Sequence, residues 1–361
     1  TADWLRAMPT DEVEATVRHA KLTTLDPQGA QSVDGITHTA MQHILDTLVG
    51  RDAATGNLVP RLATSWEVAE DASRFTFHLR SGATFSDGTP VDAEAVRKNL
   101  DAVAALGARS MLGSGYLQGY RRTEVVDAHT VRVVFAGPNA QFLQATSTPT
   151  LGLLSPAMLR RAAEQRCAGP VIGSGPFTLK SYTPDKSVEL DRRDDYRWGS
   201  SLWHGRGAAR LDRITFQVVP ESGVRSGSLT SGQVDAIAGV APQDEAGLKA
   251  QRVSVVSRAN PGVPVALSAN TASPLGADVA VRRALQAAVD REEVVATVLS
   301  PSYRAATSSL SSTTDDYRDN AALLRHDTGR AASLLDAAEW RTGADGIRVK
   351  DGRKLNLEVI L

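Results

Sequence analysis

The sequence predicts an α/β protein with more than one lobe, on three grounds. Its 361 residues exceed the roughly 250–300 residues at which one hydrophobic core stops growing. Segments that alternate apolar and polar residues, as strands do, are interspersed with segments of helical period. These segments do not follow the regular strand–helix–strand order of a parallel sheet, and no fixed-length repeat or low-complexity linker separates them. We therefore expect lobes that share several chain crossings.

Several segments have the alternation of a half-buried strand. The clearest is Arg74–Arg80, where every second residue is large and apolar. Two more are centred on Val133 and Phe216, and further strands are expected over Glu14–Ala20 and over 355–361. The residues expected to face a core are Phe75, Phe77, Leu79, Val131, Val133, Phe135, Ile214, Phe216, Val218, Leu355, Leu357, Val359 and Leu361.

Three other segments have the spacing that marks the buried side of a helix. The first covers Thr37–Leu48. The second follows Asp92 and the third follows Asp278, and each of these aspartates is a candidate N-cap. Turn residues at Asp52–Asn57 and Asp87–Pro90 separate helices from strands. The residues expected on the three apolar stripes are Ile36, Ala40, Ile44 and Leu48, then Ala93, Val96, Leu100 and Val103, and then Val281, Leu285, Ala288 and Val295.

The charge balance and the single cysteine exclude several kinds of site. Forty basic and 41 acidic residues give a net charge of −1, whereas nucleic-acid-binding domains carry a strongly basic surface. The basic pairs Arg121–Arg122 and Arg192–Arg193 are expected on solvated faces. Cys167 has no partner for an intramolecular disulfide, and its thiol is expected to be buried and inert. The sequence has no run of about 18 apolar residues that would predict a transmembrane helix.

No motif predicts catalysis, a metal site or a cofactor. None of the seven histidines has the HExxH spacing of a zinc site, and His38 and His43 would point in different directions from one helix. Gly173–Pro176 has neither the dinucleotide-binding nor the P-loop pattern, and Ser174 lacks the GxSxG context of a nucleophile. We expect this run to form a tight turn that leads into a strand. The sequence therefore favours a binding protein over an enzyme.

Three runs in the first hundred residues follow one another closely. They read LVPRLATSWEV at 58–68, FTFHLR at 75–80 and FSDGTPVDAEAV at 85–96. In order and spacing they resemble the signature of the family 5 extracellular solute-binding proteins, which are the oligopeptide-, dipeptide- and nickel-binding components of ABC importers. Shorter elements extend the resemblance over residues 14 to 361; they are Leu25–Pro27, Gly173–Phe177, Asp194–Gly199, Gly232–Ala236, and Asn270–Thr271 followed by Val281–Leu285 and Asp290–Arg291.

The resemblance implies a two-lobed periplasmic-binding-protein-like fold of the cluster C type, with an inserted subdomain. Residues 1–38 would form the first part of the lobe I core, 39–167 the inserted subdomain of lobe I, and 168–267 the return to the lobe I core. Residues 268–361 would form only the N-terminal portion of lobe II, which would be incomplete at the C-terminus. A ligand would be enclosed when the lobes close around a hinge.

The resemblance also implies six ligand-binding candidates. Residues 33–36 would present backbone groups to a bound peptide, as in strand addition, and Asp34 would either pair with a peptide α-amine or cap the helix that follows. Arg109 aligns with an arginine that holds carboxylates in nickel-binding relatives; the alternative is a surface residue. Leu112, Gly152 and Ala30 stand where those relatives have a tryptophan, an arginine and an aromatic residue. The six candidates are Val33, Asp34, Gly35, Ile36, Arg109 and Asn270.

The implied function is capture of an oligopeptide or dipeptide outside the cytoplasm and its delivery to an ABC permease and ATPase, with no nucleic-acid partner. The expected location is the periplasm or the cell surface, with a signal segment before Thr1 and a lipid-attachment cysteine if the source is Gram-positive. A C-terminal continuation or a separate fragment would complete lobe II. Two alternatives remain: a truncated or two-fragment relative that acts as a sensor or interaction protein, and a protein that binds a nickel chelate.

Overall fold

The computed structural model describes residues 12–17, 28, 35–166, 170–203, 205, 207–257 and 259–359, with the backbone alone for 12–17 and 35–38. The chain divides into two compact units, Thr1–Val240 (unit 1) and Ala241–Leu361 (unit 2). Each unit has its own hydrophobic core and is described by itself below. The lobe boundaries expected from the sequence stay a prediction.

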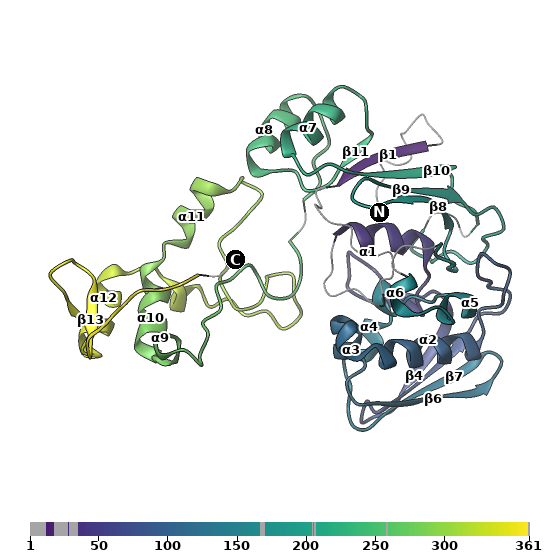
Figure 1. The fold of residues 1–361 in the computed structure, drawn as a ribbon, viewed down its shortest axis with the longest axis horizontal. Helices are drawn as coiled ribbons and strands as arrows, with labels where there is room; N and C mark the ends of the chain where they lie inside the picture. The colour runs from purple at the N-terminus through teal and green to yellow at the C-terminus, as the bar shows by residue number, and fades with distance from the viewer. Residues whose placement is uncertain are drawn as a thin grey trace. The chain divides into compact units, whose positions relative to one another are not determined.

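The first layer of unit 1 is a five-stranded sheet with the order β11-β1-β10-β9-β8 (Figure 1). Strand β1 pairs in parallel with both β10 and β11, whereas β10–β9 and β9–β8 are antiparallel. The predicted strand Glu14–Ala20 begins two residues earlier than expected, and residues 18–20 lie outside the described part of the chain. The strands are β1 Glu12–Val17, β8 Phe177–Thr183, β9 Ser187–Arg192, β10 Arg213–Val218 and β11 Ala236–Ile237.

Helix α1 (Gly35–Ile44) packs on one face of this sheet. Its buried residues Ala40, Met41 and Ile44 contact the inward side chains of β9 and β10, which include Phe216. The helix was predicted to continue to Leu48, but it ends at Ile44. The carbonyl of Ile44 accepts a hydrogen bond from the amide of Gly175 at 2.7 Å, and Leu48 leads into β2 instead.

The second layer is an antiparallel four-stranded sheet with the order β4-β5-β7-β6. The predicted alternation in β5 and β7 is confirmed, because Phe75, Phe77, Leu79, Val131, Val133 and Phe135 are all buried. These side chains meet the buried stripe of α2 (Ala93–Leu106) in one core. Asp92 is the N-cap of α2, as predicted: its carboxylate accepts a hydrogen bond from the amide of Ala95 at 2.8 Å. The strands are β4 Ala63–Val68, β5 Arg74–Leu79, β6 Tyr120–Asp127 and β7 Thr130–Phe135.

The remaining elements of unit 1 are short. They are β2 Val49–Arg51, β3 Leu58–Pro60, η3 Gly107–Arg109, α3 Met111–Tyr116, α4 Phe142–Ala145, η4 Pro149–Leu151, α5 Pro156–Leu159, α6 Ala163–Arg166 and α7 Ser222–Thr230.

Unit 2 is mainly helical, with a small core between α10 and α12. Asp278 is the N-cap of α10, as predicted, and accepts a hydrogen bond from the amide of Ala280 at 2.8 Å. The core residues are Val281, Ala284, Ala287, Ala331, Leu335 and Trp340. The elements are α8 Pro242–Ala250, α9 Pro274–Ala277, α10 Val279–Ala288, α11 Arg291–Val298, η5 Ala321–Leu324, α12 Thr328–Ala337, β12 Arg341–Thr342, β13 Arg348–Lys350 and β14 Arg353–Lys354.

Two predictions for unit 2 were wrong in part. The stripe predicted after Asp278 does not lie on one helix, because α10 ends at Ala288, which is exposed, and Val295 belongs to α11. The predicted strand at 355–361 is absent over the described residues 355–359. Leu355 donates one hydrogen bond to the carbonyl of Arg348 in β13 at 2.7 Å, and no residue of 355–359 belongs to a strand. Leu355 packs against the unit 2 core, while Leu357 and Val359 are exposed.

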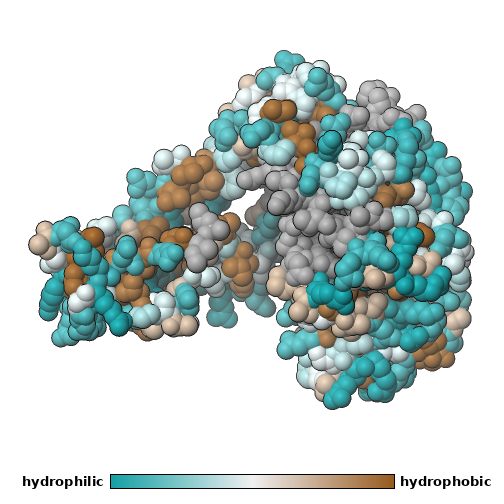
Figure 2. Space-filling view, in the orientation of Figure 1, coloured by the Kyte–Doolittle hydropathy of each residue, from teal (hydrophilic) through white to brown (hydrophobic). Residues whose placement is uncertain are grey.

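Unit 2 exposes many apolar side chains. Figure 2 shows brown side chains where Figure 1 places α11, and Val294 and Val298 of that helix are exposed. Val263, Val265 and Leu267, which precede α9, are also exposed. Exposed apolar surface on this scale is typical of a surface that another segment or partner covers.

Glu245 of α8 anchors the segment after α11. Its carboxylate accepts hydrogen bonds from the hydroxyls of Ser300 and Ser302 and pairs with the Lys249 ammonium. Lys249 and then the two hydroxyls lower the pKa of Glu245 from 4.5 to about 2. A carboxyl whose folded-state pKa is lowered contributes stability that is present above its unfolded-state pKa.

We therefore expect Glu245→Gln to remove part of the acid sensitivity of unit 2. In the wild type, this contribution should be lost as the pH falls from about 4.5 to about 2. Hydrogen exchange of the α8 amides as a function of pH measures it, with the exposed Glu292→Gln as control. A pH dependence that is the same in Glu245→Gln and in the wild type would show that the contact contributes nothing.

Candidate functional site

Gln28 is a fully buried polar residue on which three segments of unit 1 converge. Its side-chain amide donates hydrogen bonds to Asn99 Oδ1 at 2.8 Å and to the carbonyl of Gly152 at 3.2 Å. Its Oε1 accepts a hydrogen bond from Arg166 Nη1 at 3.2 Å, and its backbone carbonyl accepts one from the Ser110 hydroxyl. Buried polar groups with partners of this kind hold the segments that carry them in one arrangement.

Asn99 of α2 completes this network. Its Nδ2 donates to the carbonyls of Ala95 and Leu154, each at 2.9 Å, and its Oδ1 accepts from the amide of Leu154 at 2.9 Å as well as from Gln28. Both donors and the acceptor of the amide are therefore engaged, which is how a buried asparagine avoids the cost of desolvation. Gln28 and Asn99 were not among the predicted site residues, because neither belongs to a motif that signals burial.

Arg109 lies beside this network and is one of the predicted site residues. Its Nη1 donates to Glu164 Oε1 of α6 at 2.8 Å, and the two side chains are 60% and 70% exposed. The backbone amide of Glu164 and the Arg109 guanidinium hold the pKa of Glu164 below its usual range. The structure thus places an accessible ion pair directly next to Ser110 and Arg166, which are both buried.

The other predicted site residues lie elsewhere or outside the described residues. Val33 and Asp34 lie outside them, and Gly35 and Ile36 form the first turn of α1, where only the backbone is described. Asn270 belongs to unit 2; its Oδ1 accepts from the amide of Ala272 at 3.0 Å in the turn that leads into α9. Within the described part of unit 1, Arg109 pairs with Glu164, which was not among the predicted site residues.

Gly152 occupies the position at which nickel-binding relatives were expected to have an arginine. A Cβ atom here would lie 2.9 Å from the carbonyl oxygen of Pro149 and 3.1 Å from the Cβ of Leu45. The same residue offers its carbonyl to Gln28. This backbone is packed too closely for a side chain, so glycine is required by close approach.

A second buried network joins the two sheets of unit 1. Asp46 is fully buried and accepts hydrogen bonds from Arg61 Nε at 2.7 Å, Trp198 Nε1 at 2.8 Å and the Tyr196 hydroxyl at 3.3 Å. Burial raises the pKa of Asp46, and the Arg61 guanidinium with the other donors opposes this shift because they stabilise the carboxylate. Because Arg61 contacts the Asp46 carboxylate inside the protein, the role of this ion pair is structural.

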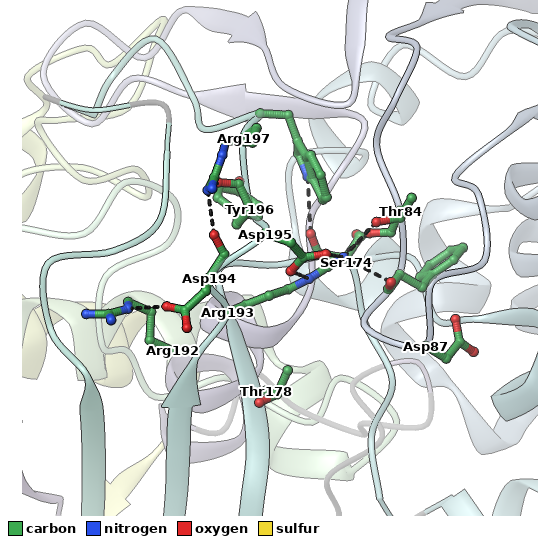
Figure 3. Close-up of polar contacts among 12 residues, drawn as sticks. Thr84, Asp87, Ser174, Thr178, Arg192, Arg193, Asp194, Asp195, Tyr196 and Arg197 are labelled. Carbon is green, nitrogen blue, oxygen red and sulfur yellow. Dashed lines mark hydrogen bonds and ion pairs between the residues drawn. The ribbon is translucent and has the colours of Figure 1, made fainter.

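Arg193 belongs to the same junction and corrects a prediction. The pair Arg192–Arg193 was expected on a solvated face, yet Arg193 is buried. It donates to the carbonyl of Thr84 at 2.8 Å and pairs with Asp195 at 2.7 Å, while its guanidinium lies 5.0 Å from the ring centroid of Trp198 (Figure 3). Arg192, the last residue of β9, is partly exposed and pairs with the exposed Asp194 at 2.7 Å, a contact that Figure 3 shows.

Ser174 has a structural role, as predicted. Its hydroxyl accepts a hydrogen bond from the amide of Asp46 at 3.3 Å, and its carbonyl accepts one from Trp198 Nε1 at 3.2 Å. A Cβ atom on Gly173 or Gly175 would lie 2.2 Å or 2.7 Å from the carbonyl oxygen of Ile44. The run at 173–176 is thus a tight turn against α1 that leads into β8.

Arg109 lines neither of two hollows in the described surface. One of about 570 Å³ follows the outer face of β8–β10 and is lined by Lys180, Lys186, Glu189 and Arg213, among others. One of about 340 Å³ in unit 2 is lined by Asp290, Arg291 and His326, among others. Within the described ranges, no three His, Cys, Asp or Glu side chains are grouped so as to hold a metal ion. No helix in that part of the chain is long and apolar enough to cross a membrane.

Comparison with known proteins gives consistent results. Residues 57–361 match the sequence model of the bacterial extracellular solute-binding proteins, family 5. The probable D,D-dipeptide-binding periplasmic protein DdpA of Escherichia coli K12 is 27% identical over 290 residues, which is 77% of this chain and 53% of DdpA. The glutathione-binding protein GsiB of Escherichia coli O157:H7 is 28% identical over 277 residues, which is 76% of this chain and 52% of GsiB.

Solved structures agree with the sequence comparison. NikA from Brucella suis, in complex with Fe(III)-EDTA, is 26% identical with a TM-score of 0.78, over 95% of this chain and 68% of NikA. DppA from Helicobacter pylori, in complex with the peptide STSA, has a TM-score of 0.72 at 23% identity, over 92% of this chain and 68% of DppA. The predicted fold class, α/β of the two-lobed solute-binding type, is confirmed.

The chain spans about half the length of the curated relatives it matches. The family consists of binding proteins and not of enzymes, in agreement with the missing catalytic motifs. Because the match covers residues 57–361, the chain belongs to family 5 of the bacterial extracellular solute-binding proteins.

Proposed function

We propose that this chain is the extracytoplasmic solute-binding component of an ABC importer and that its ligand is peptide-like. The observation that carries the proposal is the match of residues 57–361 to the family. The names of its relatives point to small peptides: DdpA binds D,D-dipeptides and GsiB binds glutathione. The ligand would be enclosed between two lobes and passed to the permease and ATPase subunits of the importer.

The proposed ligand contacts are the six residues predicted from the sequence. Arg109 would take a peptide carboxylate, because a guanidinium suits bidentate carboxylate capture. Asp34 would pair with an α-amine, and Val33, Gly35 and Ile36 would offer backbone groups. Asn270 would contribute from the crossover into the second lobe. The exposure of the Arg109 side chain, 60%, supports its access to a ligand.

A metal chelate is the second candidate ligand. The likeness to NikA in complex with Fe(III)-EDTA favours it, because the carboxylates of such a chelate are a chemical match for Arg109. Gly152 stands against a close copy of a nickel site, since the packing at this position leaves no room for an arginine.

We further propose that the apolar surface of unit 2 is covered by additional segments of the same fold or by an associated fragment. The exposed Val263, Val265 and Leu267 support this, because large apolar side chains that are exposed close together are typical of a surface that another segment covers. A relative that works as a sensor or interaction protein would use the same surface for a partner. Export by a signal segment before Thr1, with or without lipid attachment, is part of the proposal.

Calorimetric titration with di-, tri- and tetrapeptides and glutathione tests the function. The wild type is expected to bind at least one of these ligands with nanomolar to micromolar affinity and to release it without chemical change. Arg109→Ala and Asp34→Ala should each weaken that binding by about 1.5–3 kcal/mol, the contribution of a hydrogen bond to a charged group. The melting temperature should hardly change in Arg109→Ala, because the side chain is exposed.

The control is Arg122→Ala, which removes another exposed arginine from an ion pair in unit 1. It should leave peptide affinity unchanged. No binding to a folded wild type would count against the importer function and favour the sensor alternative. Unchanged affinity in both Arg109→Ala and Asp34→Ala would remove these two residues from the site.

A further inference from the structure

The ion pair Arg109–Glu164 differs from the other exposed ion pairs near it. Pairs such as Glu94–Arg97 join neighbours on one helix. Arg109 and Glu164 are 55 residues apart in the chain, and each is next to a buried residue that is bonded to Gln28. Ser110, which follows Arg109, donates to the Gln28 carbonyl, and Arg166, two residues after Glu164, donates to Gln28 Oε1.

Gln28 therefore fixes the backbones that carry the two charges. Gln28 itself is held by Asn99, whose amide is fully engaged within α2 and with Leu154. The charged ends of Arg109 and Glu164 remain at the surface. Exposed ion pairs contribute little to stability, so these ends can separate at small cost while their supports stay in place. Charged groups that are accessible to a ligand, on a backbone held in place by buried hydrogen bonds, are more typical of a ligand site than of a structural ion pair.

The charges restrict the ligand that such a pair accepts. A carboxylate that binds the Arg109 guanidinium has to displace Glu164, whose ionised carboxyl then lies close to a second negative charge. Like charges in proximity are unfavourable. A ligand that also brings a cation next to its carboxylate removes this cost, because its cation pairs with Glu164. The Arg166 guanidinium also acts on Glu164, but it is buried and engaged with Gln28.

We propose that the Arg109–Glu164 pair recognises a free α-amino-acid head group, in which an ammonium and a carboxylate sit on the same carbon. This inference rests on the proposed solute-binding function and refines its ligand class. The guanidinium takes the ligand carboxylate and Glu164 takes the ligand ammonium, so that one internal ion pair is exchanged for two intermolecular ones and the total charge is conserved.

The proposal separates two kinds of peptide. In an ordinary α-linked peptide, the ammonium and the carboxylate are on different residues and cannot both reach this pair. In a γ-glutamyl peptide such as glutathione, the γ-glutamyl residue keeps both groups on its α-carbon. The pair therefore selects free amino acids and γ-linked peptides over α-linked ones.

Calorimetric titration with glutathione and with N-acetylated glutathione, whose ammonium charge is removed, tests the proposal. The wild type should bind glutathione and bind the acetylated form at least about tenfold more weakly, the scale of one lost charged hydrogen bond. Glu164→Gln should weaken glutathione binding by about the same factor. It should strengthen binding of the acetylated form, because it removes the like charge next to the ligand carboxylate. The matched control Glu124→Gln, which removes a partly exposed carboxylate paired with Arg122, should affect neither probe.

Alanylalanine and free L-glutamine, titrated alongside, separate this proposal from the proposed function. A wild type that binds alanylalanine but neither glutathione nor L-glutamine would leave the solute-binding function intact and overturn the head-group assignment. Unchanged or tighter glutathione binding in Glu164→Gln would also overturn it, because Glu164 would then act only as a competitor for Arg109. A folded wild type that binds none of the probes would contradict both proposals. Thermal melting of each variant confirms folding, since both side chains are exposed.

Discussion

Asp46→Ala is expected to lower the free energy of unfolding of unit 1 by about 3–5 kcal/mol, the cost of removing one partner from a buried ion pair. The variant would leave the Arg61 guanidinium, 12% exposed, without its counter-charge. It would also leave the indole N–H of Trp198 and the hydroxyl of Tyr196 without the carboxylate that they bond. Chemical denaturation followed by tryptophan fluorescence measures the change, because Trp198 lies in this network.

The control for Asp46 is Asp194→Ala. Asp194 also pairs with an arginine, Arg192, at 2.7 Å, but its side chain is 81% exposed. Surface substitutions of this kind usually change stability by no more than about 0.5 kcal/mol. Equal losses in the two variants would show that the Asp46 network contributes no more than a surface pair.

Phe142→Ala is expected to cost about 3–5 kcal/mol, as for other fully buried phenylalanines. The Phe142 ring is fully buried in the core of the four-stranded sheet. Its centroid lies 4.8 Å from that of Phe135 and 5.0 Å from that of Phe75, both in edge-to-face contact. Alanine would leave a cavity that the surrounding strands can fill only in part. The favourable edge-to-face contacts between the Phe142 ring and its two neighbours would also be lost.

Two variants make this prediction specific. Phe142→Leu keeps most of the volume and should cost much less than Phe142→Ala. Met111→Ala removes a large apolar side chain that is 60% exposed and should change stability by about 0.5 kcal/mol at most. Thermal unfolding of all three is the measurement. Equal melting temperatures for Phe142→Ala and Met111→Ala would show that the Phe142 ring does not stabilise the core.

The strands were predicted better than the helix ends, and the physical reason is visible in particular residues. The alternation in β5 and β7 is a local property of the chain, and both strands lie where it indicated. The end of α1 depends on a distant residue, because the amide of Gly175 bonds to the carbonyl of Ile44. The segment 355–359 shows the opposite case: its alternation is present, but a strand needs a hydrogen-bonded neighbour, which the sequence pattern does not supply.

The site was predicted only where the family resemblance marked it. Arg109 came from alignment, whereas Glu164, Gln28 and Asn99 have no local signal, because their roles arise from contacts between residues far apart in the chain. Arg193 was placed on the surface because basic pairs usually lie on solvated faces. Besides the neighbouring Asp195, its partners are backbone carbonyls and a ring that only the folded structure brings near.

The position of β1 has a consequence for the order in which the protein folds. Glu12 pairs with Arg213, and Ala15 with Ala236, so the first described strand lies between two of the last strands of unit 1. Pairing of such distant segments closes a long loop, and contacts of this kind form slowly. During synthesis, β1 has to wait for residues 213–237 before either of its edges is paired. Until then the five-stranded sheet cannot close around it, and both open edges are available for pairing with other chains.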